Sequence, residues 1–578
     1  MKKNELVRKG LALMLAGVLA VSVAGCGDQG KQSEGSASDS AETKEQQQEQ
    51  QAESDSGEQN GSSEAVNEGW FPIVDEQITI SAAGVNVSTV DWNETDMVAW
   101  FGEKMGILMN CSQYETDAWS SQFSLMLASD DLPDLLVNPA DISVVNQYVE
   151  DGYFLAISDY LDYAPNLKAF LEEHPDYKAM CTAADGNIYG LVQYNDNKYA
   201  RLQRAFIDRV WLENVGMEYP KTVEELYETL KAFKEKDANG NGDSTDEIPV
   251  SGDTNASWYL AVMSAFGMPV SDTAYGLMLS DGTVTLAQTT ENYQAYLTYM
   301  NRLYSEGLYD EAALVQNSDE FVAKARDGRV GTFGAAAPFV TLGQDASVDA
   351  GYMALGGLTS EWNATGAFPL AAGVSSGVKL LVKADTAYPE AIVRLIDYFY
   401  TDDGILMAAK GTEKSVKMEE NPFDASYQQA ITFIPDGEED NYDSAEAYRY
   451  KKAIINEGFN VIKSMEGSEY SFVDSASDEL LASEEVAKTY GWSVLMERRI
   501  RETGTVDVMP ALLYQESEAN RRNTLYTDIS NYIRQAAAQF ISGELDPETD
   551  YESYLNTLKQ MKLEELIQIE QAAYDRMY

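Results

Sequence analysis

The sequence predicts an α/β protein with mainly parallel sheets, and three observations support this fold class. Short apolar strands alternate with amphipathic helices from about residue 77 onward. No fixed-period repeat runs through the 578 residues, which disfavours solenoids and propellers. Hydrophobic residues make up 44% of the chain, so a large core can be buried. An alternating order of this kind favours sheets that are covered by helices on both faces.

The first part of the body predicts three strands joined by helices. Residues 77–81 alternate polar and apolar side chains, which is typical of a strand. Residues 96–105 carry apolar side chains at helical spacing, and Gly106 is placed to cap the end of that helix. Residues 107–109 and 134–137 are predicted as the next two strands, with another helix between them. This order favours parallel pairing of the three strands.

Later elements continue the alternation. A capping box, with Thr222 as N-cap and Glu225 three positions later, predicts a helix that runs to about Lys234. The other expected elements are helices at 297–303, 321–325 and 389–400 and strands at 330–333 and 379–382. From Ser483 onward the chain is predicted to be mostly helical.

The charge and the scarcity of histidine narrow the functions that the chain can have. A net charge of −54, from 41 basic and 95 acidic residues, argues against a nucleic-acid partner, which requires a basic surface. The one histidine, His174, excludes His-rich zinc sites and disfavours Ser-His-Asp and Cys-His catalysis. We expect His174 to be solvated near a helix end. No CxxC pair is present, and Cys111 and Cys181 form either a disulfide or two separate buried thiols.

Residues 1–25 are predicted to be a lipoprotein signal peptide. Four basic residues among the first nine precede the apolar stretch of residues 10–23, which is too short to span a membrane. The sequence Val23-Ala24-Gly25-Cys26 resembles the bacterial lipobox, although this motif more often has Leu where Val23 stands. We therefore expect Cys26 to be lipidated, with palmitate among its acyl chains, and to hold the protein on a membrane. The alternative is a secreted protein with a free cysteine.

Residues 26–70 are predicted to form a disordered acidic tether rich in Ser, Gln and Glu. Runs such as residues 46–51 contain no large apolar side chain, so they cannot bury enough surface to offset their ordering entropy. About 40 such residues have a typical end-to-end distance of roughly 35 Å. The folded body is therefore expected to stand off the outer membrane face.

Several motifs, in their order along the chain, resemble a known family. They are residues 128–134 (ASDDLPD), 185–191 (DGNIYGL), 219–222 (YPKT) and 327–331 (DGRVG), with a tail at 540–543 (FISG), 550–554 (DYESY) and 571–576 (QAAYDR). Together with the lipobox, they are similar to those of the extracellular solute-binding proteins (family 1) of carbohydrate ABC transporters. The resemblance is to the Gram-positive lipoprotein type, which is similar to alginate-oligosaccharide binding proteins, and it covers the chain from about residue 75 onward.

The resemblance implies a two-lobed periplasmic-binding-protein-like (type II) fold, with a hinge and a helical C-terminal region. We place residues 71–195 and 365–415 in the first lobe and residues 196–364 and 416–578 in the second. It also implies a monomer, outside the cytoplasmic membrane, that captures a carbohydrate by hinge closure and delivers it to permease subunits without catalysis. The long chain and its many aromatic residues favour an oligosaccharide ligand.

A second motif, residues 237–247, resembles the front half of a calcium loop. Oxygen-bearing side chains at positions 1, 3 and 5, followed by Gly242 at position 6, can converge on one hard cation. Position 12 is Ile248, so the bidentate Glu of an EF-hand is absent and Asp246 and Glu247 close the shell instead. The expected structural Ca²⁺ ligands are Asp237, Asn239, Asn241, Asp243, Asp246 and Glu247. In the resembled family the acidic pair usually comes one residue earlier, and the alternative here is a solvated Asn-Gly turn.

Aromatic side chains near strand ends are the candidates for the ligand cleft, because sugar rings stack on aromatic faces and ligands collect at the carboxyl ends of strands. The candidates are Trp258, Trp119, Tyr194, Trp362 and Trp492, with Arg204 as a polar contact. Each has an alternative role, in the core for the aromatic residues and in a surface ion pair for Arg204. Trp100 and Trp211 have apolar neighbours at helical spacing and are predicted to be core.

Two other functions are weighed against a sugar-binding protein. A lipid-anchored glycoside hydrolase needs only two suitably spaced carboxylates, and 95 acidic residues cannot exclude such a pair. However, no motif positions one acid, and the strand order does not predict eight βα units of a barrel. A peptide-binding protein of the same fold is the third hypothesis.

Overall fold

The computed structural model describes residues 69, 71–85, 90–202, 204–252, 258–272, 274–343, 348, 351–455, 458–465 and 468–578. The predicted signal peptide, Cys26 and all of the tether except Gly69 lie outside the described residues. Among the described helices, none has the length and apolar character that a membrane span requires.

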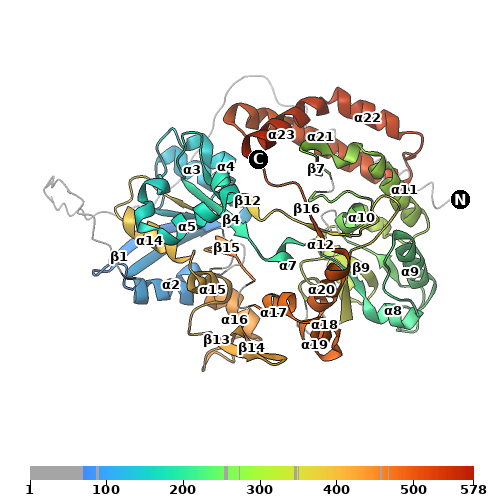
Figure 1. Ribbon diagram of the computed structural model, residues 1–578, viewed down its shortest axis with the longest axis horizontal. Coiled ribbons are helices and arrows are strands. Elements are labelled where there is room, and N and C mark those ends of the chain that lie inside the picture. Colours follow the sequence, from blue (N-terminus) through green and yellow to red (C-terminus); the bar gives the residue numbers. More distant parts are fainter. Residues whose placement is uncertain are drawn as a thin grey trace, which may run out of the picture. The chain divides into compact units, whose positions relative to one another are not determined.

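The first lobe is built on a six-stranded sheet (Figure 1). Its strand order is β15 (Ile462–Lys463), β4 (Gly190–Asn195), β12 (Val374–Val382), β3 (Leu135–Val137), β1 (Ile78–Val85) and β2 (Ile107–Tyr114). As predicted, β1 pairs in parallel with both β2 and β3. Strand β12 runs antiparallel to β3 and β4, and β15 lies parallel to β4. The sheet is therefore mixed, with β12 as its antiparallel member.

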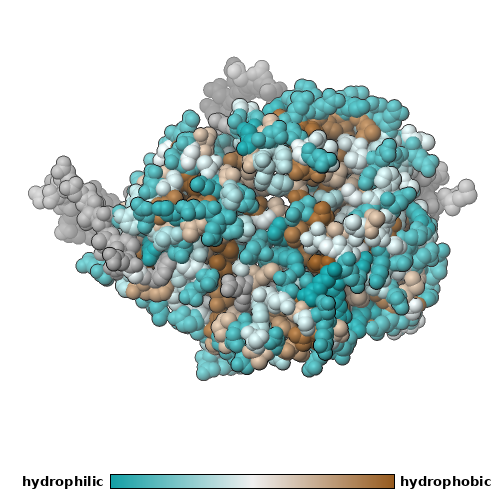
Figure 2. Space-filling view, viewed as in Figure 1, coloured by the Kyte–Doolittle hydropathy of each residue, from teal (hydrophilic) through white to brown (hydrophobic). Residues whose placement is uncertain are grey.

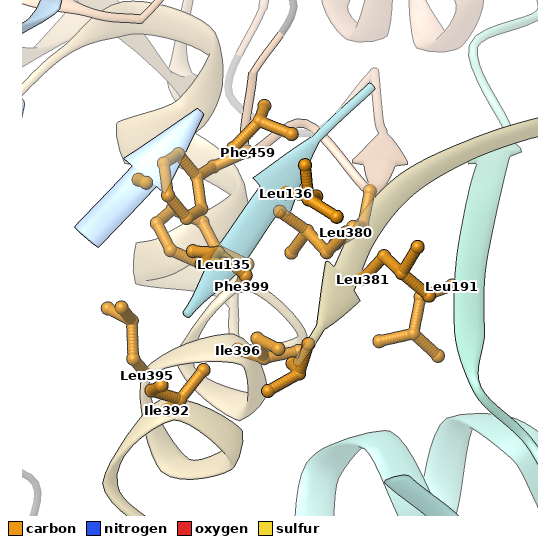
Figure 3. Packing of buried hydrophobic residues seen from close by; sticks show 14 of the residues in the cluster. Leu135, Leu136, Leu191, Leu380, Leu381, Ile392, Leu395, Ile396, Phe399 and Phe459 are labelled. Atoms are coloured by element: carbon orange, nitrogen blue, oxygen red, sulfur yellow. The ribbon is translucent and has the colours of Figure 1, made fainter. Parts of the chain in front are cut away.

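Apolar side chains fill the space between this sheet and helix α14 (Pro389–Tyr398), as Figure 3 shows. Leu135 and Leu136 are adjacent on β3, and both are fully buried because both faces of the sheet are covered. Ile392, Leu395 and Ile396 lie at positions i, i+3 and i+4 of α14 and form its buried face. This lobe also contains the helices α2 (Asp96–Trp100), α3 (Thr116–Ser129), α5 (Pro165–Glu173) and α6 (Pro175–Cys181).

The second lobe is built on a four-stranded sheet. Its order is β10 (Tyr352–Leu355), β5 (Ala205–Asp208), β9 (Val330–Gly334) and β6 (Ile248–Val250). Helices α8 (Arg209–Val215), α9 (Val223–Glu235), α10 (Trp258–Ala265) and α11 (Glu291–Ser305) belong to this lobe. The capping box is confirmed, since the Thr222 hydroxyl accepts from the Glu225 amide and the Glu225 carboxylate accepts from the Thr222 amide. Trp100 and Trp211 are buried, as predicted.

The helical C-terminal region consists mainly of α20 (Trp492–Thr503), α21 (Glu516–Ser542), α22 (Tyr551–Gln560) and α23 (Leu563–Met577). Ile529, Ile533 and Phe540 lie on one side of α21 and join the core of the second lobe. The remaining elements are α4 (Ile142–Val145), α7 (Lys198–Arg201), α12 (Ser318–Arg326), α13 (Pro338–Leu342), α15 (Asp402–Lys410), α16 (Ala445–Tyr448), α17 (Glu469–Ser475), α18 (Asp478–Ala482), α19 (Glu484–Tyr490), β7 (Leu277–Ser280), β8 (Thr283–Leu286), β11 (Phe368–Leu370), β13 (Val416–Asn421), β14 (Asp424–Thr432) and β16 (Thr505–Asp507).

The division of the chain between the lobes differs from the prediction at two places. Strand β11 lies in the range predicted for the first lobe, but it pairs with β16, and Phe368 packs in one core with Phe206 and Phe333 of the second sheet. The chain first passes from one lobe to the other after β4, in the first sheet, and before β5, in the second. This crossing follows the predicted boundary at residue 195. Strand β15, however, belongs to the first sheet, and Tyr448, Ile454 and Phe459 belong to its core. The share of the first lobe thus extends to Lys463 and does not end at residue 415, because these apolar side chains have their partners in the first core.

Candidate ligand-binding cleft

A cleft of about 580 Å³ is lined by residues of both lobes. The first lobe contributes Asp141, Ser143 and Val144 near α4, and Ser376 on β12. The second lobe contributes the loop between α10 and β7 and the start of α21, and the segment 508–512 completes the lining. The lining side chains of the second lobe are Ser271, Asp272, Tyr275, Leu277, Tyr514, Arg522, Asn523 and Tyr526.

A buried carboxylate on α23 fixes two tyrosines of the cleft. Glu570 is fully buried, and its Oε1 accepts hydrogen bonds from Arg522 Nε at 3.0 Å and from the Tyr275 hydroxyl at 3.1 Å. The Tyr514 hydroxyl donates to the other oxygen of the same carboxylate. Burial, followed by the charge of Glu570, raises the pKa of both tyrosines, so they remain neutral donors at physiological pH. The carboxylate of Glu570 thus holds the rings of Tyr275 and Tyr514 in place and also binds Arg522.

The guanidinium of Arg522 orders the aromatic side of the cleft. Its central carbon lies 4.4 Å from the ring centroid of Tyr526 and 4.8 Å from that of Tyr514, within the range of cation–π contacts. Arg522 and Tyr526 are four residues apart on α21, so they project from the same face of the helix. The side chain of Arg522 is only 18% exposed. The arrangement presents aromatic rings beside a rigidly held cation.

Two carboxylates face the cleft from different lobes. Asp141 Oδ1 caps α4 by accepting from the Ser143 amide at 2.9 Å and the Ser143 hydroxyl at 2.7 Å. Asp272 Oδ1 accepts from the Tyr275 amide at 3.1 Å, which holds the loop before β7. Burial and then the charge of Asp272 raise the pKa of Tyr526, in agreement with their common position in the cleft. Aromatic faces with polar groups between them suit a ligand that has apolar faces and a rim of hydroxyls.

The structure places three of the predicted ligand contacts in the cores of the lobes. Trp258 is 1% exposed beside Tyr309, and Trp119 is 6% exposed with its indole nitrogen donating to the Pro139 carbonyl at 2.7 Å. Trp492 is 2% exposed and packs against the guanidinium of Arg204 at 5.5 Å. Large aromatic side chains contribute most to stability where they are buried, which accounts for these positions.

The other two predicted aromatic contacts lie elsewhere. Tyr194 is half-buried between His174 and Phe170, with ring centroids 4.5 Å and 5.2 Å away. His174 is therefore part of an aromatic cluster and not a fully solvated residue. Trp362 is 37% exposed and lines a separate hollow of about 570 Å³ beside α11. None of the six predicted contact residues lines the cleft, although all six lie in the described part of the chain. Among the six, only Arg204 and Trp492 contact each other.

The side chains that do line the cleft carry a weak sequence signal. Arg522, Asn523 and Tyr526 form a polar and aromatic stripe at the start of a long helix, and Tyr514 comes shortly before it. Nothing in this local pattern connects the stripe with Asp141, which lies far earlier in the chain. Only the fold brings these side chains together.

The predicted calcium loop follows α9 and is held together by hydrogen bonds among its own residues. Asp237 Oδ2 accepts from the Gly242 amide at 2.9 Å, and Asp246 accepts from the side-chain amides of Asn239 and Asn241 at 3.1 Å and 3.0 Å. Asp237 Oδ1 and Glu247 Oε2 are buried and have no hydrogen-bond partner. Among the described residues no three acidic, His or Cys side chains form a ready metal cluster. The two buried carboxylate oxygens without partners nevertheless fit a hard cation, because burying them without compensation is costly.

The two cysteines of the described chain are free thiols, so the disulfide alternative is not realised. Cys111 lies on β2 and Cys181 ends α6, and both are buried. Burial raises the pKa of each thiol to about 12, which makes both of them inert small apolar residues.

Residues 96–414, more than half of the chain, match the family model described as bacterial extracellular solute-binding protein. The chain belongs to this family. The family assignment that the sequence motifs indicated is thereby confirmed, and the extracellular solute-binding proteins act outside the cytoplasm.

The curated relatives include three Gram-positive proteins. The fructooligosaccharide ABC transporter substrate-binding protein FusA of Streptococcus pneumoniae serotype 4 is 31% identical over 276 residues, which are 46% of this chain and 50% of the relative. Lipoprotein LipO of Bacillus subtilis is 30% identical over 220 residues, 37% of this chain and 41% of the relative. The polygalacturonan/rhamnogalacturonan-binding protein YtcQ of B. subtilis is 29% identical over 211 residues, 36% of this chain and 40% of the relative. The chain thus spans half or less of the length of these relatives.

Solved structures share the fold over nearly their whole length. FusA of S. pneumoniae in complex with kestose has a TM-score of 0.65 and 22% identity, covering 86% of this chain and 99% of that one. An extracellular solute-binding protein of Bifidobacterium longum subsp. infantis has a TM-score of 0.69 and 21% identity, with coverage of 87% and 98%. The alginate-binding protein AlgQ2 without calcium ion has a TM-score of 0.61 and 18% identity, with coverage of 87% and 99%. The predicted two-lobed type II fold is confirmed.

Proposed function

We propose that this protein is the substrate-binding subunit of an ABC importer that captures an oligosaccharide in the cleft between its lobes. The single observation that carries the proposal is the cleft itself, where Tyr514, Tyr526 and Arg522 are held in place opposite Asp141. Aromatic rings can stack on sugar faces, and the carboxylates can accept hydrogen bonds from hydroxyls. The ligands named for the relatives, above all the fructooligosaccharide of FusA, support a carbohydrate ligand.

Hinge closure is the proposed mode of capture. The cleft takes side chains from both lobes, so a ligand bound there contacts Asp141 on one side and Tyr526 on the other. A ligand that makes both contacts binds the closed arrangement more tightly than the open one, and it therefore shifts the population toward closure. The closed protein is then the form that a permease recognises, and the ligand is released unaltered.

Thermal unfolding with a panel of glycans tests this proposal. A ligand present at 100 times its dissociation constant stabilises the folded state by about 2.7 kcal/mol, so a true ligand raises the melting temperature clearly. Chromatography of the same mixtures tests the hydrolase alternative, because a binding protein leaves the glycan intact. A panel of peptides tests the remaining alternative. Accumulation of shorter sugars, or a shift with peptides alone, would contradict the proposal.

We also propose that the loop of residues 237–247 binds Ca²⁺ as a structural ion. Asp237, Asn239, Asn241, Asp243, Asp246 and Glu247 would hold it, and the buried oxygens of Asp237 and Glu247 without partners support this role. The ion would neutralise the carboxylates at the junction between α9 and β6. We expect EDTA to lower the melting temperature, Ca²⁺ to restore it, and Asp237→Asn to abolish the response. Asp319→Asn, at an exposed acidic position on α12, is the control.

The lipid anchor at Cys26 is likewise a proposal, with the chain held on the outer face of the cytoplasmic membrane of a Gram-positive bacterium. Radiolabelled palmitate should label the full chain, and Cys26→Ser should release it into the medium. Equal membrane retention of the two proteins would contradict lipidation at this cysteine.

A further inference from the structure

We propose that the cleft selects neutral oligosaccharides against glycans that carry a carboxylate on each ring, and that Asp141 and Asp272 set this preference. The inference rests on the proposed sugar-binding function. The relatives include a fructooligosaccharide-binding protein and a polygalacturonan/rhamnogalacturonan-binding protein, so they leave the charge of the ligand open. The charges of the residues that line the cleft decide between a neutral and an acidic ligand.

Three charged side chains line the cleft, and two of them are acidic. Asp141 and Asp272 are carboxylates, and Arg522 is the one cation among the described lining residues. The Nε of Arg522 is already bonded to the fully buried Glu570 at 3.0 Å. The four side chains together carry a charge of −2, so Arg522 is neutralised before any ligand arrives.

Two further arginines, on segments that adjoin the lining, are also paired. Arg201 donates at 2.7 Å to the carbonyl of Ala371, the residue before Ala372 of the cleft lining. It also lies 3.6 Å from the carboxylate of Asp507. Arg576 pairs with Glu518 near the start of α21. The internal segments outside the description (86–89, 203, 253–257, 273, 344–347, 349–350, 456–457 and 466–467) contain no Lys or Arg, so they add no positive charge.

The chemistry of carboxylates explains the selection. An ionised Asp only accepts hydrogen bonds, so it favours a sugar hydroxyl, which can donate. A uronate is itself an acceptor that carries a negative charge, and two carboxylates at close range repel each other. Near a protein surface this repulsion is stronger than in bulk water, because the effective dielectric constant is lower. Juxtaposed like charges are a common means of rejecting a wrong partner.

Isothermal titration of the full chain tests the inference. Neutral fructo-, gluco- and xylo-oligosaccharides are compared with oligogalacturonides and alginate oligosaccharides of equal length, at low and high salt. We expect at least one neutral glycan to bind, and the acidic glycans to bind at least about tenfold more weakly, which corresponds to ~1.4 kcal/mol. Added salt should narrow the difference, because it screens the repulsion.

Four variants locate the effect: two single variants, the double variant that combines them, and a control. Asp141→Asn and Asp272→Asn keep the oxygen that caps α4 or holds the loop, since Asn can serve in both places. We expect the double variant to reduce the ratio between neutral and acidic affinities at least fivefold. Asp528→Asn, at an exposed position of α21 away from the cleft, is the control and should leave the ratio unchanged. Circular dichroism and melting temperature verify that each variant is folded.

The outcomes separate the two proposals. Acidic glycans that bind as tightly as neutral ones overturn the charge preference and leave the proposed function intact. Selectivity that survives in the folded double variant overturns the role of Asp141 and Asp272. Failure of every neutral and acidic glycan to bind overturns the proposed function itself.

Discussion

Replacing Glu570 with Gln is the sharpest test of how the cleft is built. The carboxylate accepts from Arg522, Tyr275 and Tyr514, which belong to three separate segments. Gln has nearly the same volume, but only one of its terminal atoms accepts, and the other presents an N–H group to a donor. Arg522 also loses its partner, although it remains largely buried at 18% exposure.

The expected cost follows from these contacts. A hydrogen bond to a charged group contributes about 1.5–3 kcal/mol, and breaking a buried ion pair costs about 3–5 kcal/mol. Because Gln keeps one acceptor and Arg522 is partly solvated, we expect Glu570→Gln to lower the free energy of unfolding by ~3 kcal/mol. The affinity for a glycan should fall as well, since Tyr275 and Tyr514 lose their fixed positions.

Urea unfolding followed by tryptophan fluorescence measures the effect. Glu565→Gln is the matched control, because Glu565 lies on the same helix and pairs with Arg521 of α21 at the surface. Exposed ion pairs contribute little to stability, so this variant should unfold at the midpoint of the wild type. Equal midpoints for Glu570→Gln and wild type would refute the role of Glu570 as the anchor of the cleft.

Three further predictions concern other parts of the molecule. Tyr526→Ala should weaken glycan binding about fivefold in titration calorimetry, since an aromatic contact contributes about 1 kcal/mol. The melting temperature should also fall, because the ring packs against Tyr275 and Arg522. Cys111 and Cys181 should not react with a thiol reagent at pH 8 until the chain is unfolded, because burial raises the pKa of both to about 12. Burial also raises the pKa of Asp208 to about 6, above the unfolded value near 3.9. The free energy of unfolding should therefore fall as pH rises from about 4 to 6, and Asp208→Asn should remove this part of the slope in urea titrations. Rapid labelling of the native thiols, or an identical slope in the Asn variant, would contradict the corresponding prediction.

Local patterns in the sequence predicted much of the fold. Thr222 and Glu225 form their capping box because the motif is satisfied within one helical turn. Gly106 ends its helix at a φ of 79°, a conformation that favours glycine. The three parallel strands follow from the alternation of elements around them. Such features depend on neighbours in the chain, so the sequence displays them directly.

The cleft and the limits of the lobes depend on contacts across long stretches of chain. Trp258 was assigned to the cleft from its place after a loop, but the core of the second lobe buries it. Tyr275 and Arg522 were missed, because their common partner, Glu570, is far from both in sequence. Strand β15 lies in the range predicted for the second lobe but joins the first sheet, since a strand of two residues gives no periodic pattern. Long-range packing decides all three cases.

The position of Glu570 along the chain has a consequence for biogenesis. During synthesis and export, Asp141 and Asp272 emerge early, whereas the residue that immobilises Tyr275, Tyr514 and Arg522 emerges after all of them. A chain that stops before α23 therefore lacks the carboxylate that positions these three side chains, however much of its secondary structure has already formed. The geometry of the cleft thus depends on α23, which is made after all the elements that line the cleft.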